Sequence, residues 1–237
     1  MIPAVVISVA AFMILVEVFG SGRTWPKVRG WWTRAFFLNG FQFLIAFLAP
    51  LTLDPWMSGY RPWNLDALGT TGGALFGYFV ITFLFYGWHR MRHEVDFLWR
   101  WFHQVHHSPQ RIEIITSFYK HPFEIVVNSL LSSAILYFVV GLGPLACGYA
   151  LLLTGLAELL YHWNVRTPYW LGFIVQRPES HCVHHQAGLH HYNYADLPLW
   201  DMLFGTFHNP KSWDLACGFG DEPEHKLGPM LRGEKVS

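Results

Sequence analysis

The chain has 237 residues, of which 52% are hydrophobic, 18% aromatic and 14% charged. Its 16 basic residues balance its 16 acidic residues, so it lacks the basic field that a nucleic-acid partner requires. The composition also excludes a disordered chain, and 3 cysteines without CxxC spacing exclude a disulfide scaffold. What remains is a membrane protein or a very apolar enzyme, with 14 histidines among few charged residues.

Five apolar stretches have the length of membrane-spanning helices. A helix needs about 20 residues to cross a hydrocarbon core of about 30 Å. The stretches are 3–19, 35–53, 71–88, 123–141 and 145–162. The last two form a hairpin closed by glycines and a proline at 141–144, because these residues break helices. We therefore predict one domain, an all-α integral membrane protein with about four to five transmembrane helices.

The basic residues predict an orientation, because they are enriched in cytoplasmic loops. If the first stretch runs from outside to inside, only Arg61 of the 16 basic residues lies outside. Every histidine then lies at or beyond the cytoplasmic face. We expect an outside N-terminus, a helical cytoplasmic cap from 89–122 and 163–210, and a loosely ordered tail over 211–237.

Eight histidines fall into three tight groups within the predicted cap. Helical residues three or four apart lie on one face, so the members of a group can share one metal ion or bridge two. Imidazole suits Fe, Zn, Cu and Ni, and eight ligands are too many for one ion. No HExxH motif is present, which disfavours a zincin-type protease. The groups are His89 and His93, then His103, His106 and His107, then His181, His184 and His185.

These groups read HxxxH, HxxHH and HxxHH along the chain, and Asn193-Tyr194 and a WDxxFGT segment at 200–206 follow them. From about 88 to 207 the chain resembles the fatty acid hydroxylase/sterol desaturase superfamily of integral membrane diiron oxygenases. The resemblance implies two iron ions, with zinc as a possible substitute, O2 as co-substrate, and hydroxylation of an unactivated C–H bond of a lipid. It also implies a separate electron donor, a ferredoxin or a cytochrome b5-like carrier with its reductase.

The resemblance extends the expected site beyond the three groups. It assigns a ligand role to His162, at the end of the last apolar stretch. Some family members have a second histidine four residues later, where this chain has Arg166, so one ligand set stays open. Candidates to complete it are His121, His190 and His191. Glu158 and Asp201 are expected to accept hydrogen bonds from ligand imidazoles, and Asn193 is a further candidate site residue.

Two alternatives stay open at this point. A desaturase or an ether-cleaving monooxygenase would use the same scaffold, and fatty acyl, sterol, carotenoid and alkyl ether substrates are all compatible with it. A membrane protein that binds or transports metal without redox chemistry is the alternative of another class. A transporter places its ligands near the middle of its spans, whereas histidine occurs here only at their ends.

Overall fold

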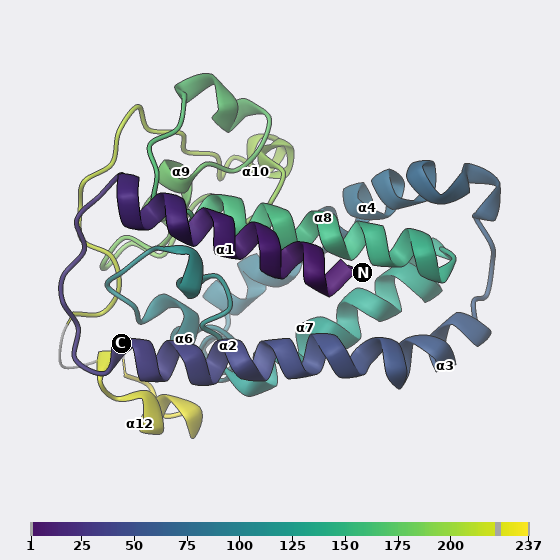
Figure 1. Ribbon diagram of the computed structural model, residues 1–237, viewed down its shortest axis with the longest axis horizontal. Coiled ribbons are helices and arrows are strands. Elements are labelled where there is room, and N and C mark those ends of the chain that lie inside the picture. Colours follow the sequence, from purple (N-terminus) through teal and green to yellow (C-terminus); the bar gives the residue numbers. More distant parts are fainter. Residues whose placement is uncertain (1, 221–223, 237) are drawn as a thin grey trace.

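The computed structural model describes residues 2–220 and 224–236; positions 221–223 and 237 of the predicted tail lie outside it. Within the described residues the chain is helical, as predicted: no strand is present, and one isolated antiparallel bridge joins Gln186 to Cys217. Long apolar helices lie along the longest axis, and shorter helices gather mainly at one end of them (Figure 1).

Five apolar helices form the body of the protein in its described part. They are α1 (Ile2–Gly20), α2 (Trp31–Leu48), α4 (Gly69–Glu94), α7 (Pro122–Ala134) and α8 (Pro144–His162). Short segments extend two of them or precede a third: η1 (Ala49–Leu51) and α3 (Leu53–Gly59) follow α2, η2 (Asp66–Leu68) precedes α4, and the π-helical η4 (Ile135–Val140) follows α7. The helix α4 packs along α8, and α2 packs against α7.

Four helical stretches among the described residues are long and apolar enough to cross a membrane. They are Trp31–Gly59, Asp66–Glu94, Pro122–Val140 and Pro144–His162, and the apolar helix over Ala4–Gly20 is shorter. This agrees with the predicted four to five transmembrane helices. Phe36, Phe37 and Phe47 on α2 are more than half exposed. Large apolar side chains on an outer face suit a lipid environment.

The turn between α7 and α8 follows from its glycines and proline. Gly141 has a φ of 78°, in the left-handed region that glycine tolerates without steric cost. Pro144 is the first residue of α8, where its missing N–H costs no hydrogen bond. Between them, Leu142 is buried in a cluster with Ile81 of α4. The hairpin is therefore anchored to a third helix and not only closed on itself.

The shorter helices form a cap over the end of the bundle where α4 and α8 finish (Figure 1). They are α5 (Asp96–Phe102), α6 (Gln104–His107), η3 (Ile114–Thr116), η5 (Tyr169–Phe173), α9 (Pro178–His184), α10 (Pro198–Phe204) and α12 (Leu227–Leu231). Two of them, α9 and α10, begin at a proline, which is favoured in the first turn of a helix. The predicted histidine-rich region therefore contains the expected helices, which are joined by longer loops.

The described part of the tail differs from the loosely ordered segment that its composition predicts. Met230 on α12 is fully buried in a cluster with Trp31 of α2. Glu224 is also fully buried and pairs with Arg34 at 2.8 Å. A composition rich in glycine, proline and charge does not reveal these contacts, because they depend on partners almost 200 positions away in the chain.

Candidate metal centre

The ends of four helices carry the clustered histidines to one place. His89 and His93 occupy successive turns at the end of α4, where positions i and i+4 share a face. The second histidine box lies directly before α6 (His103) and at its end (His106 and His107), and His162 is the last residue of α8. The third histidine box lies on α9 and directly after it. Because these helix ends converge, residues far apart in sequence become neighbours.

The nine histidines form two separate groups. The first contains His89, His93, His103, His107 and His184, and the second contains His106, His162, His181 and His185. Within each group the potential ligand atoms all lie within 4.8 Å of one another. Such a spacing allows one metal ion to be bound by each group.

Adjacent histidines divide between the two groups. His106 belongs to one and His107 to the other, and His184 and His185 are divided in the same way. Consecutive helical residues point about 100° apart, so a histidine doublet naturally serves two sites. The rings of His107 and His185 stack at 4.1 Å, which places the groups side by side.

The nitrogen atoms of these imidazoles fit metal ions. Nε2 of His103 lies 2.8 Å from Nε2 of His89 and 3.1 Å from Nε2 of His107. In the described part of the chain, the Nε2 atoms of His93, His184 and His185 are buried without a hydrogen-bond partner. Buried nitrogens with no partner are costly unless another group satisfies them, and a metal ion does so.

Burial also keeps the imidazoles of the cap in the protonation state that binds metal. Exclusion from solvent lowers the pKa of His106 and of His107 well below the usual value, and neighbouring imidazoles lower it further. The same causes act on His103, His181 and His185. A neutral imidazole offers a lone pair to a metal, whereas a protonated one does not.

Backbone carbonyls orient three of the rings. Nδ1 of His89 donates to the carbonyl of Tyr194 (2.6 Å), and Nδ1 of His184 donates to that of Tyr192 (2.8 Å). Nδ1 of His162 donates to the carbonyl of Glu158 (2.9 Å). A proton held on Nδ1 leaves the Nε2 lone pair free for a metal.

The loop that supplies two of these carbonyls has an unusual backbone. Its residues Tyr192 and Asn193 have φ angles of 67° and 52°, and His190 has 48°. Such values are uncommon outside glycine, although asparagine tolerates them. Side-chain hydrogen bonds hold the loop in this conformation. The amide of Asn193 donates to the carbonyls of Ser180 and His208, both at 2.8 Å.

Asp201 holds the other end of the same loop. Its carboxylate accepts from the backbone N–H groups of Tyr194 (2.8 Å) and Ala195 (2.9 Å) and from the hydroxyl of Thr206 (2.7 Å). Burial raises the pKa of Asp201 to about 6. Neither Asp201 nor Asn193 is among the nine clustered residues. Both residues hold the loop whose carbonyls contact the imidazoles. Asp201 therefore does not accept a hydrogen bond from a ligand imidazole itself, although the sequence led us to expect this.

The remaining candidates from the sequence lie outside both groups. Nδ1 of His121 accepts from the N–H of Phe123 (3.0 Å) and caps α7. The ring of His190 packs on His107 at 5.2 Å, but its nitrogens belong to neither cluster. His191 is exposed. The carboxylate of Glu158 pairs with Lys120, so this residue serves His162 through its carbonyl and not through its side chain.

Sequence reasoning missed a buried carboxylate next to the first group. Oε1 of Glu124, in the first turn of α7, lies 3.1 Å from Nδ1 of His103. Glu124 also pairs with Arg92, which lies between the two histidines of the first box, and both side chains are buried. An acid in the first turn of an apolar stretch was the available signal, because ionisable residues inside spans are usually functional.

A cavity of about 1040 Å³ begins at the histidines and extends between α1, α2, α4, α7 and α8. His89 and His103 of the first group and His106 and His181 of the second line its inner end. Its volume is that of a site for a drug-sized ligand or larger. A molecule held among the membrane-spanning helices would therefore lie against both groups.

In the part of the chain that the structure describes, the fold and the site together define a helical protein of the membrane-spanning type with two histidine groups that could hold metal ions. The chain belongs to the fatty acid hydroxylase family, whose profile matches residues 74–206. The matched segment contains the nine clustered histidines. No solved structure matches the chain.

Several curated proteins are similar to this region. Human alkylglycerol monooxygenase is 33% identical over 160 residues, which are 62% of this chain and 33% of that protein. The ornithine lipid hydroxylase OlsE of Rhizobium tropici is 35% identical over 142 residues, 58% of this chain and 42% of the relative. A very-long-chain aldehyde decarbonylase, GL1-9 of Oryza sativa subsp. indica, is 27% identical over 173 residues, which are 71% of this chain and 55% of that protein. The chain thus spans between a third and about half of these relatives.

Proposed function

We propose that this protein is a membrane-bound, non-haem diiron, O2-dependent oxidoreductase that hydroxylates an unactivated C–H bond of a lipid. One observation carries the proposal: two groups of mostly buried histidines converge at the inner end of a cavity among apolar helices. The relatives support it, since their names describe a lipid hydroxylase, a monooxygenase and a decarbonylase.

Two iron ions bound by the nine histidines would supply the oxidation of the C–H bond by O2, and zinc would occupy the same ligands as a substitute. The residues of the chain perform the other tasks. Burial keeps the imidazoles neutral, and the carbonyls of Tyr192 and Tyr194 fix two of the rings. The cavity positions a lipid beside both groups.

Desaturation and ether cleavage remain the alternatives on the same scaffold. Both would use the same ligands, so only the product distinguishes them from hydroxylation. The similarity to an alkylglycerol monooxygenase is the observation that keeps ether cleavage in the comparison. Transport of metal without redox chemistry is less well supported, because the histidines gather at one end of the helices and not at mid-span.

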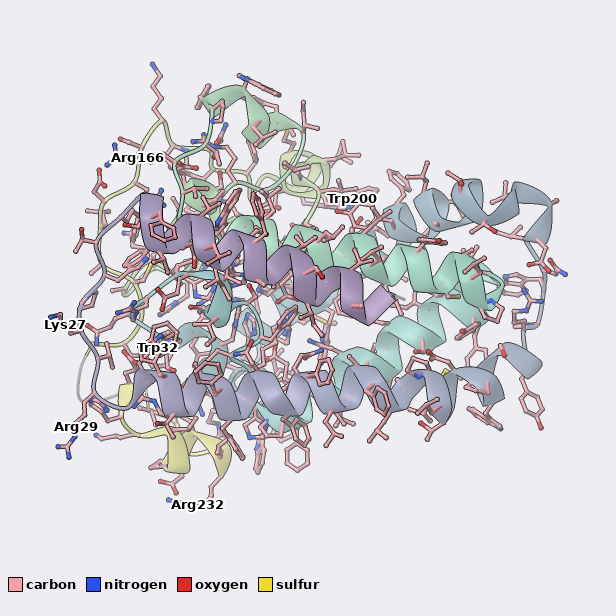
Figure 2. The ribbon with its side chains drawn as sticks, viewed as in Figure 1. Lys27, Arg29, Trp32, Arg166, Trp200 and Arg232 are labelled. Atoms are coloured by element: carbon pink, nitrogen blue, oxygen red, sulfur yellow. The ribbon has the colours of Figure 1, made fainter. Side chains whose placement is uncertain are left out.

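The distribution of basic residues supports a cytoplasmic location for the metal centre and an outside N-terminus. Lys27, Arg29, Arg166 and Arg232 lie at the end of the bundle that carries the cap (Figure 2). Arg61 lies between α3 and α4, at the opposite end. We expect Lys27→Cys to be shielded from an impermeant thiol reagent in intact cells and Asn64→Cys to react. The reverse pattern would invert the proposed orientation.

The reaction also needs two electrons per turnover from a separate donor, which we propose is a ferredoxin or a cytochrome b5-like carrier with its reductase. The decisive test is reconstitution of the purified protein with iron under anaerobic conditions, followed by addition of such a donor, mixed lipids and O2. We expect a hydroxylated lipid that depends on O2 and is absent for His106→Ala and His184→Ala. His191→Ala, at an exposed position, serves as the matched control. No O2-dependent product from any lipid class would overturn the proposal.

A further inference from the structure

The cavity beside the metal centre has walls of different polarity. On the α7 side it is lined by Asn128, Ser129, Ser132 and Ser133. These positions recur after four residues, so they form one face of a helix that is otherwise apolar enough to cross a membrane. The other walls are mostly apolar, with Phe85 of α4 and Leu152 of α8 among their residues, and their polar side chains include Gln42 of α2 and Thr154 of α8.

Two of the four polar side chains on α7 are already engaged with protein groups. Oδ1 of Asn128 accepts from Nε1 of Trp88 (2.9 Å). The hydroxyl of Ser133 donates to Asp54 (2.6 Å). These contacts explain the retention of both residues in an apolar helix without reference to a ligand.

The other two side chains are different. Within the described residues, the hydroxyls of Ser129 and Ser132 have no hydrogen-bond partner, and both residues line the cavity. A polar group taken out of water without a partner costs free energy, so such hydroxyls are expected to meet either water or a polar group of the occupant.

Their position along α7 gives a distance from the reacting end of the cavity. Glu124, which contacts His103, marks the metal end of α7. With a helical rise of about 1.5 Å per residue, Ser129 lies about 7 Å and Ser132 about 12 Å beyond Glu124. A group that meets these hydroxyls therefore lies about one to two helical turns beyond Glu124, on the side away from the histidines.

We propose that the substrate is a lipid with a hydrogen-bond-accepting oxygen, such as an ester, amide or ether oxygen, which lies about 7–12 Å beyond Glu124 along the cavity, away from the carbon that is oxidised. The hydroxyls of Ser129 and Ser132 donate to this oxygen, and the apolar walls hold the alkyl parts. An unsubstituted hydrocarbon chain leaves both hydroxyls without a partner. This inference rests on the proposed function, because it assumes that the cavity holds the substrate of the metal centre.

Binding to the metal-free protein tests the inference separately from catalysis. The probes are a straight-chain alkane and a dialkyl ether of the same length with its oxygen at mid-chain. Each displaces a fluorescent fatty acid from the intact, chelator-treated protein in detergent. We expect the wild type to bind the ether about two- to tenfold more tightly, the gain of one to a few net hydrogen bonds. Equal affinity for both probes would overturn the proposal.

Variants locate the preference at α7. The double substitution Ser129→Ala with Ser132→Ala is expected to abolish the preference for the ether, and Ser129→Thr with Ser132→Thr to retain it. The matched control is Ser58→Ala, which also lines the cavity but whose hydroxyl already donates to the carbonyl of Pro55 (3.0 Å). A preference that survives the double alanine variant, or that is lost in Ser58→Ala alone, would refute the assignment to α7.

The outcomes separate this inference from the proposed function. If the wild type shows no preference but still oxidises lipids with O2, the substrate class is wrong and the oxygenase proposal stands. If the preference is found but no lipid is oxidised under any condition, the oxygenase proposal fails while the binding site stands. Moving the ether oxygen along the probe measures the distance: affinity should be highest when the oxygen lies opposite Ser129 and Ser132.

Discussion

Nδ1 of His103 lies 3.1 Å from a carboxylate oxygen of Glu124, and both side chains are buried. This is the arrangement in which a carboxylate holds the proton of a ligand imidazole and increases its donor strength. Arg92 pairs with the same oxygen and balances its charge. The second group shows no equivalent among the described residues: His162 donates to a carbonyl, and His181 contacts the amide of Gln176 (2.7 Å). The two groups therefore differ in the partners of their imidazoles: a carboxylate in the first group, and a carbonyl and a side-chain amide in the second.

Glu124→Gln is expected to weaken metal binding at the first group about 10- to 100-fold, the usual cost of losing such a partner. Glu124→Ala should cost more and also lower stability by about 3–5 kcal/mol, because Arg92 is left buried without its counter-charge. Competition with a chelator measures the affinity, and denaturant unfolding measures the stability. Glu94→Gln is the control, since that acid pairs with Arg90 at an exposed position. If Glu124→Gln bound metal with wild-type affinity, the carboxylate would have no role in metal binding.

Neighbouring histidines are expected to control different metal ions. His106→Ala removes a ligand of the second group and His107→Ala one of the first, although the residues are adjacent in sequence. Each variant should bind about one metal ion per chain where the wild type binds two, as measured by elemental analysis after dialysis. His121→Ala, outside both groups, should keep two. A single-metal result for His121→Ala, or complete retention by the other two variants, would contradict this division.

How much of this site the sequence predicts depends on the range of each contact. The members of a histidine box lie within one or two helical turns, so spacing alone brings them together, as for His89 and His93. Helical geometry also explains why each histidine doublet is divided between two groups, but which boxes share a group depends on how α4, α6, α8 and α9 meet, and no local pattern encodes this. The carbonyls of Tyr192 and Tyr194 carry no side-chain signal at all. The length of the apolar stretches predicted the membrane-spanning helices. The order in the tail was not predicted, because it depends on contacts with residues far away in the sequence.

Asp201→Ala is expected to disturb the first group selectively. The substitution removes three hydrogen bonds that hold the loop, so the carbonyl of Tyr194 no longer fixes His89. Metal release into excess chelator should then become biphasic, with a fast phase for one ion and a wild-type rate for the other. Asp214→Ala, at an exposed position of the tail, is the control. Equal acceleration of both ions would show a general loss of structure instead of an effect through the loop.

Removal of metal is expected to lower the stability of the whole helical bundle, because the histidines join α4, α6, α8 and α9 at one place. A ligand that binds only the folded state stabilises it by about 3–4 kcal/mol at 100 to 1,000 times its dissociation constant. For a chain of this length, that corresponds to a fall in Tm of about 5–15 °C after chelation. Readdition of iron or zinc should restore the Tm. The double variant His106→Ala with His107→Ala should start from a low Tm and respond less to chelator. A Tm that chelation does not change would show that the bundle is held together without its metal centre.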